Sequence, residues 1–247
     1  MTDPQFGFFS NNKEFSEETK LYEKAVEEIN RIRPAFVVIT GDLVNDKSNQ
    51  SQWDEFRRIT SLINPETKVY LTPGNHDIGQ APEKKDIDRY TSMFGEDRFS
   101  FGYRGCRFIG FNSCLIKANT PGLEEDQFNW LRNKLEAAGR SKQTILFCHH
   151  PFFIKDPEEP VTYSNIDPET RAKYLTLFSE FDVEAVFAGH LHNNAEGIFG
   201  VTEMITTSAV GRPLGDAPSG FRIVQVTDNK IIDRYFSLDE IPDPVLF

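Results

Sequence analysis

Residues 35–42 read AFVVITGD, a short β-branched run that gives way abruptly to a glycine and an aspartate. The same pattern recurs in KVYLTPGNHD (68–77), TILFCHHP (144–151) and EAVFAGHLH (184–192). Short apolar runs bounded by polar residues predict buried strands. Because open α/β sheets bind ligands at the carboxyl ends of their strands, we expect the four polar clusters to converge on one site.

Other segments complete the predicted fold. Further strands are predicted at 107–111, 203–207, 221–226 and 230–236. Apolar residues at helical spacing predict helices at 16–32, 51–63, 121–139 and 167–181. Strand–helix alternation followed by strands alone predicts an α/β fold, with a partly parallel sheet finished by antiparallel strands. No repeat or linker interrupts the pattern, so residues 1–247 are predicted to form a single domain.

The charge balance narrows the choice of partners. The chain has 38 acidic and 27 basic side chains and a net charge of −11. This balance predicts no nucleic-acid-binding surface, since such surfaces need clustered lysine and arginine. An anionic substrate remains compatible, because bound metal ions reverse the charge locally. No apolar run approaches the roughly 18 residues of a membrane span.

The histidines all lie in the strand-end clusters. The chain has five of them: His76, His149, His150, His190 and His192. Any one alone is best explained as an ordinary core or surface residue, but scattered structural histidines would not all follow strands. Imidazole, aspartate and asparagine together form a nitrogen and oxygen shell that suits Zn²⁺, Fe or Mn²⁺. With no C-x-x-C pair in the chain, a thiolate zinc site is disfavoured.

The order D…GD…GNHD…H…GHxH resembles the calcineurin-like metallophosphoesterase superfamily over essentially the whole chain. The chain is most similar to the calcineurin-like phosphoesterase domain-containing protein 1 group, whose vertebrate member is regarded as a protein serine/threonine phosphatase. The motifs that carry this likeness are DPQFG (3–7), GDL (41–43), PGNHDIG (73–79), GHLHNNA (189–195) and YFSLDE (235–240). The resemblance implies a four-layer α/β/β/α sandwich of two mixed sheets flanked by helices, with two metal ions (Mn, Fe or Zn) at the strand ends.

The resemblance also implies roles for individual residues. Asp3 and His192 would hold the first metal, and Asp42 would bridge both. The second metal would be held by the remaining ligands, Asn75, His149 and His190. Two such ions about 3.5–4 Å apart would activate a bridging hydroxide for attack on phosphorus.

Other side chains are expected to assist. His76 would protonate the leaving oxygen, and Asp77 would fix the tautomer of its ring. Three residues are candidate substrate contacts: His150, Asn45 and Arg212. A plain loop residue explains Asn45 at least as well, and a surface arginine is the commoner explanation for Arg212. The aromatic-rich stretches 97–105 and 149–163 would either wall the substrate cleft or pack beneath loops.

Two features depart from the superfamily pattern. Most members read D-x-H at the first motif, whereas this chain has Gln5. An amide oxygen is a weaker, neutral ligand, so we expect the first metal to be bound less tightly or to complete its shell with water. Asp3 also follows only two residues, although a central strand needs about five. We therefore expect part of the first strand to be missing. We expect a cytoplasmic location. A targeting segment would be missing together with that part of the first strand.

These expectations define a metal-dependent phosphoesterase. The leading reading is a phosphomonoesterase, including a protein serine/threonine phosphatase, acting on a phosphorylated small molecule or protein. The alternative is a phosphodiesterase that acts on nucleotides or other diesters. A non-catalytic interaction module on the same fold would be marked by lost ligands, yet GNHD and GHLH are intact. A structural metal site would close its coordination shell, whereas Gln5 leaves it open.

Overall fold

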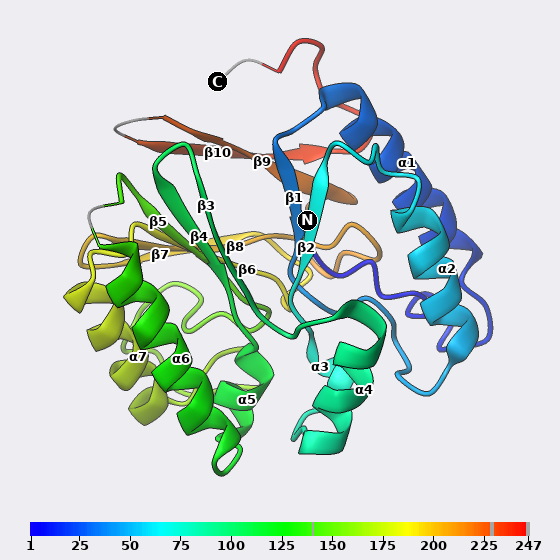
Figure 1. Ribbon diagram of the computed structural model, residues 1–247. Helices are drawn as coiled ribbons and strands as arrows, with labels where there is room; N and C mark the ends of the chain where they lie inside the picture. The colour runs from blue at the N-terminus through cyan, green and yellow to red at the C-terminus, as the bar shows by residue number, and fades with distance from the viewer. Residues whose placement is uncertain (140, 228–229, 246–247) are drawn as a thin grey trace.

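The computed structural model describes residues 1–139, 141–227 and 230–245. Its largest sheet has six strands in the order β3-β4-β5-β6-β8-β7 (Figure 1). The bounds are β3 (Phe99–Tyr103), β4 (Cys106–Gly110), β5 (Thr144–Phe147), β6 (Ala185–Ala188), β7 (Ala195–Phe199) and β8 (Thr202–Thr206). The four central strands run parallel, and β3 and β7 pair antiparallel at the two edges.

A second β layer faces the first. It contains β1 (Phe36–Ile39) parallel to β2 (Lys68–Leu71), and β9 (Gly220–Val226) antiparallel to β10 (Ile231–Ser237). Alternate residues of a strand point to opposite faces. Accordingly Val38 packs toward the six-stranded sheet, whereas Val37 and Ile39 pack toward the helices. The two β layers thus share one apolar interior.

Helices cover both outer faces. On the β1–β2 side lie α1 (Ser16–Ile32), α2 (Gln50–Thr60), α3 (Asn75–Ile78) and α4 (Lys84–Phe94). On the far face of the six-stranded sheet lie α5 (Ser113–Ala118), α6 (Leu123–Ala138) and α7 (Pro168–Glu180). Asp167 caps α7 by accepting from the N–H of Glu169 at 3.1 Å, at the start of the helix predicted for 167–181. The predicted α/β/β/α layering is confirmed. None of the described helices is long and apolar enough to cross a membrane.

The second β layer differs from the expected continuous sheet. Among the described residues, β1 pairs in register only with β2, and β9 only with β10. A cavity of about 640 Å³ lies between β1, β9 and the six-stranded sheet. Its walls include Met1, Phe36, Val38, Phe147, Phe187 and Phe221. This layer therefore consists of two strand pairs rather than one sheet.

The first residues are firmly held despite their place at the start of the chain. The Met1 amino group donates to Val38 O at 3.0 Å, and the Asp3 N–H donates to Gly41 O at 3.1 Å. On the other side, the N–H of Val210 donates to Thr2 O at 3.0 Å. These bonds place the buried Asp3 at the level of the strand ends that carry the other clusters.

Candidate metal centre

The loops after the strands turn their side chains inward through left-handed backbone. Five site residues have positive φ: Asp3 (52°), Gln5 (37°), Asp42 (48°), His190 (71°) and His192 (51°). This conformation is uncommon for residues other than glycine and is frequent at functional sites. Its repetition at three separate loops indicates that the chain bends sharply to bring these side chains together.

Two motif glycines permit the loops to touch. A Cβ on Gly74 would lie 2.2 Å from Oδ1 of Asp42. A Cβ on Gly189 would lie 1.9 Å from Oγ1 of Thr2 and 2.8 Å from Oδ2 of Asp3. Any other residue would push these carboxylates aside, so GNHD and GHLH require glycine at their first position for steric reasons.

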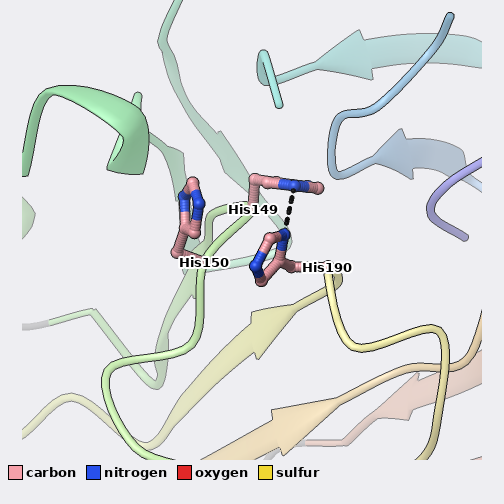
Figure 2. A group of neighbouring side chains, drawn as sticks. All are labelled: His149, His150 and His190. Atoms are coloured by element: carbon pink, nitrogen blue, oxygen red, sulfur yellow. Dashed lines mark hydrogen bonds between the residues drawn. The ribbon is translucent and has the colours of Figure 1, made fainter. Parts of the chain in front are cut away.

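One group of ligand atoms surrounds the His149 ring. Its Nε2 lies 3.0 Å from Oδ1 of Asn75 and 3.2 Å from both Oδ2 of Asp42 and Nδ1 of His190. Its Nδ1 lies 2.8 Å from Thr40 O, which fixes the ring. Figure 2 shows His149 and His190 pointing toward each other. The structure thus brings together side chains from the ends of four strands or loops.

A second group surrounds Asp3. Its Oδ1 lies 3.4 Å from Nε2 of His192, and its Oδ2 accepts from Thr2 Oγ1 at 2.6 Å and from the His190 N–H at 3.1 Å. Nδ1 of His192 lies 2.6 Å from Arg212 O, so Nε2 is the nitrogen left to face Asp3. Asp3, Asp42 and His149 also form a group of ligand atoms within 4.8 Å of one another.

Gln5 lies beside this second group. Its Nε2 donates to Oδ1 of Asn45 at 3.1 Å, while its buried Oε1 has no partner among the described residues. Asn45 in turn donates to Oδ1 of Asn12 at 2.8 Å. Asn45 therefore helps to hold the Gln5 side chain in place. The sequence suggests a substrate contact instead.

His76 and Asp77 follow Asn75 but face different ways. Nδ1 of His76 lies 2.8 Å from Asn45 O. The Asp77 carboxylate instead accepts backbone N–H groups, from Leu43 at 2.8 Å and Gly74 at 2.7 Å. The expectation that Asp77 orients the His76 ring is wrong. On the first turn of α3, consecutive side chains point in different directions, and Asp77 is buried beneath the loops that it joins.

His150 is not a rim residue. Its side chain is only 1% exposed, and its ring centroid lies 4.4 Å from that of His190. Ser113 Oγ accepts from the N–H groups of His149 and His150 at 3.0 and 2.7 Å and holds this part of the chain behind the site. The expected substrate contact is therefore corrected to a buried neighbour of the ligand cluster, because the helical start of α5 covers the ring.

Arg212 lies near His192, whose Nδ1 is 2.6 Å from the Arg212 backbone oxygen. Its side chain is exposed, and its guanidinium carbon lies 5.5 Å from the Phe8 ring centroid and 5.8 Å from that of Phe9. The Phe8 ring in turn lies 5.1 Å from the His192 ring. The Phe8 ring thus lies between this cation and His192 of the second group.

One site residue has no signal of its own in the sequence. The Tyr163 ring centroid lies 4.9 Å from that of His190, and its hydroxyl lies 3.4 Å from Nδ2 of Asn75. Tyr163 ends the aromatic stretch 149–163, whose Phe152 and Phe153 are buried in the core instead. The other stretch, 97–105, contains β3, whose Phe99 and Phe101 pack between the sheets rather than at the site.

Burial and neighbouring charges both shift the pKa values of the buried site residues. Burial works against ionisation of Asp42, but His149 and the other histidines hold the pKa of that carboxyl well below its usual range. Burial alone would lower the pKa of His149, but Asp42 and Asp3 raise it to about 9. For His190, burial and the neighbouring His149 lower the pKa to about 4.

The donor set fits metal ions. Two buried oxygens of the candidate ligands have no hydrogen-bond partner among the described residues: Asp3 Oδ1 and Gln5 Oε1. Buried polar atoms are normally satisfied, so these two unpaired oxygens point to a missing ligand. Histidine nitrogens with carboxylate and amide oxygens suit Zn, Mn or Fe.

Comparison with known proteins agrees with this geometry. A family model described as calcineurin-like phosphoesterase matches residues 3–194. The serine/threonine-protein phosphatase CPPED1 of Rattus norvegicus is 33% identical, over 97% of this chain and 83% of that protein. A dimetal phosphatase from Danio rerio has a similar fold (TM-score 0.69, 14% identity, 96% of this chain and 95% of that one). So does a purple acid phosphatase from yellow lupin (TM-score 0.67, 16% identity, 97% of this chain and 51% of that one).

Proposed function

Because this chain belongs to the calcineurin-like phosphoesterase family, we propose that it is a two-metal phosphomonoesterase that acts on phosphoserine or phosphothreonine in proteins. The convergence of Asp42, Asn75 and His190 on Nε2 of His149 carries this proposal. The name of the rat relative supports the protein substrate. The intact ligand groups speak against a non-catalytic module.

Seven side chains would hold the two metals. The first site would use Asp3, Gln5 and His192, the second would use Asn75, His149 and His190, and Asp42 would serve both. Zn, Mn and Fe all suit this donor set. When bound, two such ions would supply an activated water and neutralise charge on the phosphate oxygens. Gln5 would bind through Oε1, because its Nε2 donates to Asn45.

His76 would act as the general acid. Its Nδ1 faces Asn45 O, a carbonyl that can only accept, so Nδ1 carries a proton. To act as an acid the ring must therefore be doubly protonated, and the proton that it gives up comes from Nε2, which the fixed ring presents on the side away from Asn45. Protonation of the leaving oxygen at this atom would assist departure of an alkoxide such as that of serine.

The test is hydrolysis by the protein loaded with Mn²⁺, Zn²⁺ or Fe²⁺ in turn. The substrates are a phosphoserine peptide, p-nitrophenyl phosphate and bis(p-nitrophenyl) phosphate. We expect metal-stimulated turnover of both monoesters, and loss of that turnover in Asp42→Asn. Exclusive turnover of the diester would assign a phosphodiesterase instead. No turnover of any ester by a folded, metal-loaded protein would refute the enzyme assignment.

A further inference from the structure

Resting on the phosphoesterase function proposed above, we propose that Tyr163 is a substrate-binding residue whose hydroxyl donates a hydrogen bond to a phosphate oxygen. Tyr163 is 60% exposed, yet its ring centroid lies 4.9 Å from that of His190, which is buried in the ligand cluster. It is therefore an accessible side chain that directly adjoins the candidate metal centre.

The hydroxyl has a proton to give. Its oxygen lies 3.4 Å from Nδ2 of Asn75 and 3.0 Å from Nε2 of Gln80. Amide nitrogens can only donate, so the phenol oxygen accepts both bonds. The orientation of Asn75 is set independently, since its Oδ1 faces Nε2 of His149 at 3.0 Å. No acceptor for the Tyr163 proton lies within hydrogen-bonding distance in the described part of the chain, which leaves it available to a ligand.

The loop that carries Tyr163 is held in place. Lys117 Nζ donates to Thr162 O at 2.6 Å, and the Thr162 N–H donates to Oδ1 of Asn165 at 2.7 Å. Asn165 also donates to Oε1 of Glu159 at 2.6 Å. An exposed side chain on a pinned loop loses little entropy when it binds, which favours a role in recognition.

The chemistry of the ligand follows from the surroundings. A hydroxyl donor beside the candidate metal ligands Asn75 and His190 would meet an anion drawn to the same centre. A phosphate oxygen accepts such a bond strongly because it is charged. The exposed face of the ring would then flank the organic part of the ester. Tyr163 would thereby contribute to binding of the substrate and only slightly to the chemical step.

The test compares wild type, Tyr163→Phe and Tyr163→Leu after loading with Mn²⁺. Tyr103→Phe is the matched control, because Tyr103 is also part-exposed (41%) but lies on β3, among the aromatic residues between the sheets. Calorimetry measures the binding of inorganic phosphate. Steady-state kinetics with p-nitrophenyl phosphate give KM and kcat, and elemental analysis gives the metal content.

Tyr163→Phe is expected to weaken phosphate binding and raise KM about tenfold, with kcat within about twofold and metal content unchanged. Tyr163→Leu is expected to raise KM further, and Tyr103→Phe to match wild type. Unchanged phosphate affinity in Tyr163→Phe would overturn the proposal. So would a loss of metal, since Tyr163 would then act through Asn75. If wild type binds phosphate but hydrolyses no ester, the enzymatic function fails while the phosphate affinities still decide the role of Tyr163.

Discussion

The backbone N–H of His76 donates to Oδ1 of Asp42 at 2.8 Å. This bond joins the GNHD loop to the GD loop and sets the candidate proton donor directly beside the candidate bridging ligand. Because the link uses the backbone, the His76 side chain can be replaced without breaking it.

His76→Gln is therefore expected to lower kcat by about 10²–10⁴-fold, the usual contribution of a general acid. The loss should be smaller for p-nitrophenyl phosphate than for a phosphoserine peptide, since nitrophenolate leaves without a proton. Steady-state kinetics with both substrates test this. An equal loss for the two would contradict the role of general acid, and unchanged metal content is the control.

Gln5→His is expected to tighten binding at the first metal site. Imidazole is a stronger ligand than a neutral amide oxygen, and Gln5 Oε1 has no other partner among the described residues. Equilibrium dialysis should show tighter retention of the more weakly bound metal. Gln5→Ala is the matched variant and should lose that metal more readily. Equal retention by all three proteins would mean that Gln5 does not bind metal.

Metal binding is expected to depend on pH through His149. In the metal-free protein its pKa is about 9, so the ring is protonated at pH 7, whereas a ligand must be neutral. The apparent affinity should rise between pH 7 and pH 9 by up to about tenfold per pH unit for one released proton. Calorimetry in two buffers of different ionisation enthalpy measures that proton. If metal binding at pH 7 released no proton, the raised pKa of His149 would be contradicted.

The stability of the metal-free protein should change in the opposite direction. A histidine whose folded pKa is above its unfolded value stabilises the fold below the unfolded pKa and loses that effect as pH rises through the folded pKa. The His149–Asp42 pair should therefore stabilise the metal-free fold at pH 6 and do so less at pH 9. Thermal melts of the metal-free protein and of Asp42→Asn at both values test this. If the melting temperature of the wild type did not fall between pH 6 and pH 9 relative to that of Asp42→Asn, the effect would be excluded.

Gly74→Ala is expected to destabilise the protein by about 1–3 kcal/mol through overpacking. The new methyl group would lie 2.2 Å from both the backbone nitrogen and Oδ1 of Asp42. Metal retention should fall as well, since Asp42 must move. Gly102→Ala is the control, because its nearest contact would be an ordinary 3.8 Å. Chemical denaturation measures the free energy of unfolding of both variants. Equal values would contradict the steric role of Gly74.

The sequence predicts the layers well but not the edges. The central strands β4, β5, β6 and β8 fall within a residue of their predicted bounds, and β5 and β6 are buried along their whole length. The edge strands β3 and β7 have weaker signals, because each is only partly buried. Helix α4 is also absent from the predicted elements, although Ile87, Tyr90 and Phe94 recur at helical spacing and pack toward the core.

The candidate site shows the same division. The ligand-bearing residues can be predicted because they directly follow strands, and the structure brings them together. The roles of Asp77 and His150 could not be predicted, because the direction of a side chain depends on which loop lies above it. Tyr163 lies near His190 on a loop that Lys117 and Asn165 hold, and the Lys117 contact joins residues 45 apart in the chain, so it does not follow from local sequence.

The left-handed backbone at Asp3, Gln5, Asp42, His190 and His192 has a consequence for how such a chain evolves. Strain of this kind costs roughly 1 kcal/mol or more per residue, so the five together rival the net stability of a domain. Glycine at these positions would relieve the strain and remove the ligand in one step. A lineage released from selection for catalysis should therefore drift toward glycine there and melt at a higher temperature. This chain retains all five strained residues.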